Sequence, residues 1–556
     1  MPSLRSYQNE QVESVFREWE DKQSTLLVAA TGTGKTETFC AIINRFQPAR
    51  SLVLAHRSEL IGQASKRLWT NHRIHSDIEM ADRWANEDSW GRAPVVVSSV
   101  QTQYAGRNGN SRMRRFNPSD FGLLVVDEAH HYTASAFKKV LDYYKQNPNL
   151  KVLGVTATPD RADEQALGQV FESVAHVYEI LDAIHDGWLV PIEQQMVSIH
   201  GLDFSEVRTT AGDLNGADLA VVMEAEKNLH GIASSSLEVI GNKKTLVFTV
   251  SVKQAERLAE IYNRHRDGMA DWIYAGTPKD ERAKILRKFS DGDTQVLCNV
   301  GILTEGYDEP SVECIVQARP TKSRCLYAQI CGRALRPLTG VLERAAYEEA
   351  LADSAEARKE AIANSPKPSA LILDFVGNAG RHKLITTADI LGGKLSDEVI
   401  ERATKKAQES QMPVRMAEEL DKAERELHEE IEKRKRAEAA RRIHVKAQAD
   451  YKLRSVDPFD ILGITPARIR GWDAGKQVSE KQRGVLLRAG INPDNLSYGQ
   501  QKQLLIALFA RMNKKMCSVK QAQLLRKRNI DTAELTFDQA SAKINEIASR
   551  EGWARR

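Results

Sequence analysis

Residues 26–36 read LLVAATGTGKT, an apolar run that ends in a glycine-containing loop and then in a lysine and a threonine. Such a short apolar run is typical of a strand buried on both faces of a parallel sheet. Gly32 and Gly34 would let the loop curl so that consecutive backbone N–H groups face inward, beside the positive end of a following helix. The stretch therefore predicts a strand, a phosphate-binding loop and a helix, in that order.

The side chains at the end of this loop fit a bound phosphate chain. Lys35 would reach the β and γ phosphates of a nucleoside triphosphate, and the Thr36 hydroxyl would hold Mg²⁺. The strict pattern has glycine at position 29, where this chain has alanine. From the loop alone, a strand-to-helix turn without a ligand therefore stays an alternative.

The alternation of apolar runs and amphipathic segments continues along the chain and predicts parallel α/β sheets covered by helices on both faces. The other runs of strand length are SLVLA, VVVSS, LLVVD, VLGVT, TLVFT, TQVLCN, ECIVQA and LILDF. They form two sets, and residues 190–219 between them have weaker periodicity, which we interpret as connecting sequence. We expect two α/β domains, at residues 1–190 and 191–390.

The composition is that of an ordinary soluble protein, with 556 residues, 42% of them apolar and 28% charged, which is too long for one core. No apolar stretch is long enough to span a bilayer, and the N-terminus lacks a signal-peptide pattern, so we expect a cytoplasmic protein without membrane contact. The six cysteines are scattered, which favours reduced, packed thiols over disulfides or a zinc site. The net charge is only +4 and does not by itself argue for a nucleic-acid partner.

A second run, LLVV, leads directly into Asp127 and Glu128. Strand ends of this kind are where α/β sheets place ligand-binding groups. Asp127 suits Mg²⁺ held through water, and Glu128 suits orienting or deprotonating an attacking water. Taken alone, the pair is equally well a charged strand end.

Seven elements, in this order, resemble those of superfamily 2 helicases and translocases. They are the upstream glutamine element LRSYQ (4–8), motif I AATGTGKT (29–36), motif Ia LVLAHRSEL (52–60), motif II DEAH (127–130), motif III TATP (156–159), motif V TEGYD (304–308) and motif VI QICGRALR (329–336). The resemblance covers about residues 4–380. It implies two tandem RecA-like domains, with motifs I to III in the first and motifs V and VI in the second, that use ATP and Mg²⁺.

The family's residue roles carry over to the matching positions. Gln8 would recognise adenine, and His130 would relay the state of the γ phosphate. Arg333 and Arg336, three apart on a helix and so on one face, would supply guanidinium groups from the second domain. The catalytic residues implied are Lys35, Asp127, Glu128, His130, Gln329, Arg333 and Arg336. The nucleotide-binding residues implied are Arg5, Gln8, Thr31, Gly32, Thr33, Gly34, Lys35, Thr36, Gly306 and Asp308. The metal ligands implied are Thr36 and, through water, Asp127.

The resemblance also implies a motor cycle. The two domains would close on ATP and open when the γ phosphate is lost, because that loss removes the contact that held them together. The candidate nucleic-acid contacts are Ala55, His56, Arg57, Ser99, Gln101, Thr249 and Thr304. Hydroxyls, amides and cations of this kind bind phosphates and read no bases, so we expect tracking that is independent of sequence.

DNA is favoured over RNA on resemblance. Motif III, LAHRSEL and FESVAHVYEILDAIHDGWLVPI look like DNA-directed members: RadD-type repair helicases, type I restriction motor subunits and phage-borne helicases. LILDFVGNAGRHKL resembles the RadD and phage set, which suggests a bacterial cell or a phage-infected host, whereas DEAD-box RNA proteins typically have aspartate where this chain has His130. A branch-migration or annealing remodeller, an RNA helicase, the motor of a restriction or defence complex, and a scaffold without turnover stay open.

Beyond residue 390 the motifs stop. Residues 391–450 are rich in strong helix formers with few apolar positions, which predicts one long, exposed, charged helical arm from about residue 395. A solvated spacer or short coiled coil, and a helix that lies on a protein partner or on DNA, are both open interpretations.

Residues 451–556 contain a tandem repeat with a period of 39 residues. SEKQRGVLLRAGINPDNLSYGQ, from Ser479, aligns with SVKQAQLLRKRNIDTAELTFDQ, from Ser518. The shared apolar positions predict a small helical core, with Ser479 and Ser518 as helix N-caps. Residues 468–530 contain fourteen Lys and Arg against three Asp and Glu, an excess of eleven positive charges. We expect a second nucleic-acid anchor here, with a protein-docking or merely soluble module as the alternative.

Overall fold

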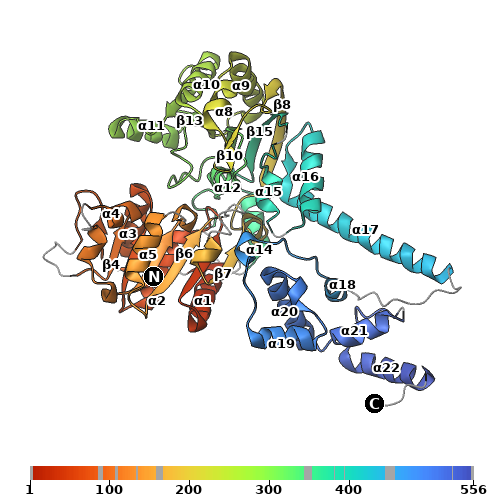
Figure 1. The fold of residues 1–556 in the computed structure, drawn as a ribbon. Helices are drawn as coiled ribbons and strands as arrows, with labels where there is room; N and C mark the ends of the chain where they lie inside the picture. The colour runs from red at the N-terminus through yellow and green to blue at the C-terminus, as the bar shows by residue number, and fades with distance from the viewer. Residues whose placement is uncertain are drawn as a thin grey trace. The chain divides into compact units, whose positions relative to one another are not determined.

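The computed structural model describes residues 4–85, 92–106, 111–132, 135–157, 167–342, 354–380, 382–393, 395–444, 457–528 and 530–551. The chain forms two compact units, one of residues 1–391 with 401–421 and the other of residues 392–400 with 422–556. The first unit contains two seven-stranded sheets (Figure 1). Within the described residues, no helix has both the length and the apolar character that crossing a membrane requires.

The first sheet is parallel throughout, in the order β3-β4-β2-β5-β6-β1-β7. Its strands are β1 (Ser24–Ala29), β2 (Arg50–Leu54), β3 (Ser76–Glu79), β4 (Val95–Ser98), β5 (Phe121–Asp127), β6 (Lys151–Thr156) and β7 (Ser173–Tyr178). The helices that accompany it are α1 (Ser6–Asp21), α2 (Lys35–Phe46), α3 (Ser58–His72), α4 (Val100–Tyr104), α5 (Ser135–Tyr144) and α7 (Ile180–His185). Apolar residues of α1, α2 and α3 share one core with the sheet, because each helix turns an apolar stripe toward it.

The second sheet has the order β12-β13-β11-β14-β15-β8-β16 and is parallel except for its last pair. Its strands are β8 (Ile192–Asp203), β11 (Thr245–Thr249), β12 (Ala270–Ile273), β13 (Val296–Asn299), β14 (Cys314–Ala318), β15 (Ala370–Asn378) and β16 (Val414–Arg415). A short hairpin of β9 (Thr209–Thr210) and β10 (Asp213–Leu214) stands apart from it. The predicted fold class, tandem parallel-sheet α/β domains, is confirmed.

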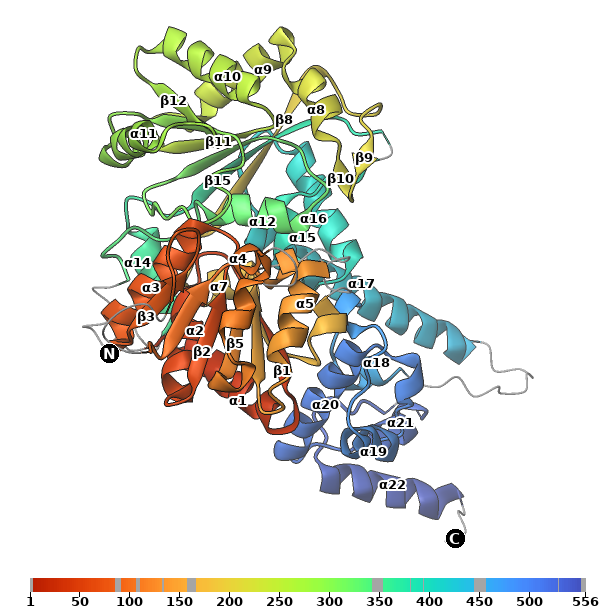
Figure 2. The ribbon, with the colours of Figure 1, turned by 60° about the vertical axis from the view of Figure 1, so that its left-hand side comes forward.

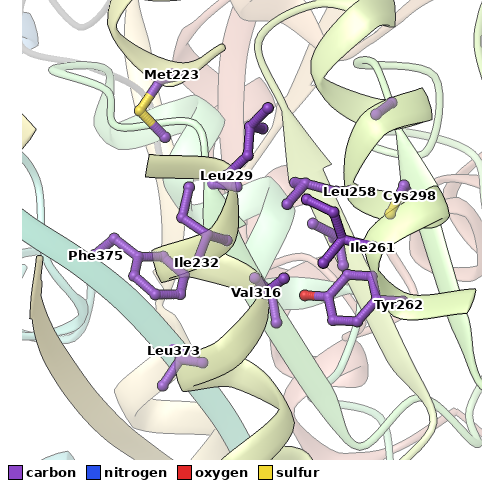
Figure 3. Close-up of a cluster of buried hydrophobic side chains, with 14 of the residues drawn as sticks. Met223, Leu229, Ile232, Leu258, Ile261, Tyr262, Cys298, Val316, Leu373 and Phe375 are labelled. Carbon is purple, nitrogen blue, oxygen red and sulfur yellow. The ribbon is translucent and has the colours of Figure 1, made fainter. Parts of the chain in front are cut away.

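Helices α8 (Gly216–Met223), α9 (Glu226–Ile240) and α10 (Val252–His265) pack on one face of the second sheet (Figure 2). Figure 3 shows their core, in which Ile232 and Tyr262 meet Val316 and Leu373 of the central strands. The remaining helices of this region are α11 (Lys279–Asp291), α12 (Arg324–Gly332), α14 (Ala355–Ala363) and α15 (Thr387–Leu391). All six cysteines are free and buried, as predicted.

The interpretation of residues 190–219 as connecting sequence is wrong, because Ile192–Asp203 forms the long strand β8 between β15 and β16. Polar residues conceal its alternation in the sequence. Gln194 is fully buried, and its side-chain amide donates to Asp374 Oδ2 at 2.5 Å. A polar side chain can occupy a core position when a partner from a distant strand satisfies it.

The prediction of one exposed helix from residue 395 to 450 is also wrong. The structure has α16 (Asp397–Glu409), the short strand β16, and then α17 (Met416–His444). Pro413 precedes β16 and disfavours a continuous helix, and Val414 pairs with Gln194 of β8. Met416 and Leu420 are fully buried, so the start of α17 is part of a core.

In the second unit, residues 457–551 form a helical module with its own core. Its helices are α18 (Pro458–Leu462), α19 (Glu480–Arg488), α20 (Tyr498–Asn513), α21 (Val519–Arg526) and α22 (Phe537–Glu551). Ser479 and Ser518 cap α19 and α21, each accepting a hydrogen bond from the backbone of the glutamine three residues on, so the predicted caps are confirmed. Equivalent apolar residues of the two repeats, such as Leu486 and Leu525, lie in this core.

Candidate nucleotide-binding site

The predicted phosphate loop connects β1 to α2. Gly34 is the N-cap of α2 and has φ 82°, a left-handed conformation that favours glycine, and no side chain caps the helix. A Cβ atom on Gly34 would lie 2.9 Å from Gln8 Nε2, so a side chain there would also crowd its neighbour. The N-terminus of α2 therefore has backbone N–H groups suited to hold phosphate oxygens.

Lys35 and Glu128 form an ion pair at the start of α2 and the end of β5. Lys35 Nζ lies 2.8 Å from Glu128 Oε1, and both side chains are about nine-tenths buried. Burial, the largest single effect, would raise the pKa of Glu128, but the charge and hydrogen bond of Lys35 and the contribution of His130 together hold that pKa below its usual range. Glu128 also has φ 50°, a strained conformation for a residue other than glycine. The carboxylate is thus ionised and held in a fixed place beside the phosphate loop.

Asp127 lies next to this pair at the end of β5. Burial, and the neighbouring charge of Glu128, raise the pKa of its carboxyl. A buried carboxylate beside a second carboxylate is stabilised by a nearby cation, so Asp127 fits the predicted metal role. Thr36 lines the same cleft.

His130 is buried, and its Nδ1 lies 2.9 Å from Thr156 Oγ1 of β6. Burial lowers its pKa to about 4, so the imidazole is neutral near pH 7. His130 Nδ1 is also 3.6 Å from Glu128 Oε2. The contact with Thr156 connects motif II to the first residue of motif III. Thr158 and Pro159, the last two residues of the predicted motif III, lie outside the described residues.

The glutamine element lies against the phosphate loop. Gln8 Nε2 donates to Thr33 O at 3.3 Å, and the Tyr7 hydroxyl donates to the same carbonyl at 2.5 Å. The Tyr7 ring stacks on Tyr178 with centroids 4.4 Å apart. The Arg5 guanidinium lies 4.5 Å from the Trp188 ring centroid. Tyr7 and Tyr178 are buried and support the loop, whereas Arg5, Gln8 and Trp188 line the cleft, where amide and aromatic groups suit a nucleobase.

Residues of the second sheet's loops complete the cleft, which has a volume of about 880 Å³. Arg333, Arg336, Gly306 and Asp308 line it opposite Lys35. Arg333 is partly buried, and burial lowers its pKa to about 10, partly offset by the charge of Glu128. The cleft therefore contains guanidinium groups from one sheet region and an ammonium group from the other.

The two regions approach closely at this point. Gly332, at the end of α12, would place an added Cβ 2.6 Å from Thr31 Cβ of the phosphate loop, so only glycine fits there without a shift. Arg336 bonds Asp308, and Arg333 donates to the carbonyl of Tyr307. Motif VI is thereby held against motif V.

The predicted nucleic-acid residues are placed differently. Ala55 is buried, and its backbone N–H donates to Ser98 O at 2.9 Å. Ser99 caps α4, and Gln101 is exposed on that helix. The Thr249 hydroxyl donates to Asn299 O at 3.0 Å, and the Thr304 hydroxyl donates to Gly301 O at 2.8 Å. Their role in binding nucleic acid stays a prediction.

Three residues near the cleft were not singled out from the sequence. Glu305 lies in motif V and His131 directly follows motif II, and their side chains meet at 2.9 Å. Lys367 is buried and donates to the carbonyls of Pro310 and Arg336 at 2.7 Å each, and burial lowers its pKa to about 7. The positions of Glu305 and His131 inside or beside motifs were the only signal for them, whereas Lys367 had none.

Comparison with known families matches two parts of the chain. Residues 1–161 match the family described as type III restriction enzyme, res subunit, and residues 227–337 match the helicase conserved C-terminal domain. The first range contains the glutamine element and motifs I to III, and the second contains motifs V and VI.

The chain is 33% identical over 360 residues to the putative ATP-dependent helicase IRC3 of Saccharomyces cerevisiae, a match of 60% of this chain and 50% of the relative. It is 25% identical over 366 residues to the type I restriction enzyme EcoAI endonuclease subunit of Escherichia coli, matching 60% of this chain and 44% of the relative. The chain thus spans about half the length of these curated relatives.

Among solved structures, the ATP-dependent type ISP restriction-modification enzyme LlaBIII bound to DNA is similar with a TM-score of 0.50 and 16% identity, covering 73% of this chain and 31% of that one. This likeness concerns the fold. The motif order, the paired parallel sheets and the two matching families together support the superfamily 2 helicases and translocases as the family that this chain resembles.

Proposed function

We propose that this chain is an ATP-driven DNA translocase or helicase whose ATPase activity is stimulated by nucleic acid. The observation that carries the proposal is the composite cleft, in which Lys35 and Glu128 face Arg333 and Arg336 from the second sheet's loops. A site built from two regions of one chain can couple the chemistry at its centre to the distance between them.

ATP would supply the phosphoryl group that is transferred to water, and Mg²⁺ would neutralise charge on its phosphates. Lys35 and the N-terminus of α2 bind the phosphate oxygens. Thr36 and, through water, Asp127 would hold the Mg²⁺ ion. Glu128 orients the attacking water and accepts a proton from it, since the Glu128 carboxylate is ionised. Arg333 and Arg336 stabilise the charge that develops on the transferred group, and Gln8 orients the base.

The proposed nucleic-acid partner is DNA rather than RNA. Relatives include a restriction endonuclease subunit and a 51.5 kDa protein of a Lactococcus phage, and one solved neighbour is described as bound to DNA. Action in the cytoplasm of a bacterial cell or a phage-infected host, and contact with a protein partner through α17 or the repeat module, belong to the same proposal. The division between the two α/β domains at residue 190, and the start of the repeat module at residue 451, are proposed with it.

ATP hydrolysis and strand displacement, measured over matched single-stranded, forked, branched and RNA substrates, test this function. We expect DNA to raise kcat for ATP more than RNA of the same length does. Displacement of a duplex strand would identify a helicase, whereas movement of a branch point without displacement would favour the remodeller alternative. Absence of ATP hydrolysis on every substrate would overturn the proposal.

A further inference from the structure

Glu305 connects the two sheet regions through both of its carboxylate oxygens. It lies in motif V and is only 6% exposed. Oε2 lies 2.5 Å from His56 Nε2 and 3.1 Å from Arg57 Nε. Oε1 lies 2.9 Å from His131 Nε2 and accepts a hydrogen bond from Gln329 Nε2 at 3.0 Å. One carboxylate thus contacts four polar side chains.

The two carboxylate oxygens of Glu305 contact residues with different predicted functions. His56 and Arg57 lie between β2 and α3, in motif Ia, and are predicted nucleic-acid contacts. His131 follows motif II, and Gln329 belongs to motif VI, so both lie beside the candidate nucleotide site. Among the described residues, the Glu305 carboxylate therefore joins motif Ia to motif VI and to the residue that follows motif II.

The same cluster has the residue types of a metal site, since ligand atoms of His56, His131 and Glu305 lie within 4.8 Å of one another. Its electrostatics oppose a cation. Arg57 is 3.1 Å from the carboxylate, and the charge of Arg333 acts on it as well. Burial would raise the pKa of Glu305, but hydrogen bonds and charge from His131 and His56 hold it far below the usual range. The surroundings therefore favour an anion.

We propose that Glu305 occupies, in the chain without nucleic acid, the position that a strand phosphate takes on His56 and Arg57. Carboxylate and phosphate oxygens use the same donors, so a strand that binds there displaces Oε2. The displaced carboxylate then changes its contacts with His131 and Gln329. This change couples binding of the strand to the geometry of the nucleotide site. Glu305 is a positioning residue in this account, which rests on the proposed function.

The substitution Glu305→Gln tests the exchange, because it removes the charge and keeps the shape. Binding is measured by anisotropy with a fluorescein-labelled 20-nucleotide oligo(dT) at low salt, and ATPase activity is measured with and without the same oligonucleotide. We expect the Kd to fall by at least about threefold, since the strand no longer competes with a carboxylate. We expect the ratio of stimulated to basal kcat to fall by at least about threefold, since the displacement signal is lost.

Two further variants keep this test decisive. Glu309→Gln is the matched control, because Glu309 is in the next turn of the same loop but its carboxylate bonds Ser290 and Ser311. It should shift neither quantity by more than about twofold. Glu305→Asp keeps the charge, and with it the folded state, while it withdraws the carboxylate by one methylene group, so it should shift both quantities in the same direction as Glu305→Gln.

A purely structural role for Glu305 would weaken oligonucleotide binding in both variants, and that outcome would overturn the inference. Unchanged Kd and unchanged stimulation in both folded variants would overturn it as well, while leaving the proposed function intact if the wild-type chain binds DNA and hydrolyses ATP. A wild-type chain that does neither would overturn the proposed function itself.

Discussion

The predicted nucleotide residues and the predicted nucleic-acid residues differ in how their polar groups are used. The nucleotide residues converge on one cleft, where the buried or partly buried charges of Lys35, Glu128 and Arg333 face a common space. Several of the predicted nucleic-acid contacts form hydrogen bonds within the protein instead, as the Thr249 hydroxyl does with Asn299 O. Burial of a charge is costly without a partner, so converging buried charges indicate a ligand, whereas a satisfied hydroxyl is equally well structural.

The largest effect is expected at the nucleotide side. Lys35→Ala removes the ammonium that bonds Glu128 and would bind phosphate, and should lower kcat for ATP hydrolysis at least about 100-fold. Lys279→Ala, at the first position of the exposed helix α11, is the matched control and should leave kcat unchanged. Steady-state ATPase assays with saturating DNA measure both. Near-normal turnover in Lys35→Ala would contradict the assignment of the converging charges to a nucleotide site.

Arg333→Lys sharpens the same side, because it keeps the positive charge and loses the planar fork of donors. Arg333 would act mainly on charge developed in the transition state, so kcat should fall by about 100-fold or more while the KM for ATP changes less. Arg266→Lys, at the end of α10, serves as the control. An equal change in KM with constant kcat would instead indicate ground-state binding.

On the nucleic-acid side, removal of the basic repeat module should have a moderate effect. A chain ending at residue 450 should bind DNA about tenfold more weakly at 50 mM salt, with a flatter dependence of log Kd on log salt, because fewer counterions are released. Lys514→Gln with Lys515→Gln in the full chain should reduce that slope by about 2 without removing the fold. An unchanged slope in both proteins would favour a docking module.

The smallest effect is expected at Thr249. Thr249→Val keeps the shape and removes the hydrogen bond to Asn299 O, so the free energy of unfolding should fall by about 1 kcal/mol while the Kd for DNA stays within about twofold. Thr245→Val, on the same strand, removes a comparable bond to Lys243 O and should behave alike. Chemical denaturation and anisotropy measure the two quantities. A selective loss of DNA binding in Thr249→Val would give its hydroxyl a direct role.

The local sequence correctly predicted the strand, loop and helix that form part of the candidate nucleotide site. The spacing of Gly34, Lys35 and Thr36 after an apolar run is enough to predict a strand, a loop and a helix, because each element depends on neighbouring residues. The same holds for the helix caps Ser479 and Ser518. The prediction of one helix over residues 395–450 failed because the position of β16 depends on pairing with β8, a strand more than 200 residues away.

The sequence by itself determined most of the strands of the two sheets, the candidate phosphate loop, and the identity of the charged groups that follow the strands. Only the tertiary structure decided that Gln194 could be buried opposite Asp374, and that Glu305 would meet His56, Arg57, His131 and Gln329. Periodicity and capping are properties of adjacent residues. The partner of a buried polar group depends on which distant segments the folded sheets bring together, and that information is not contained in local spacing.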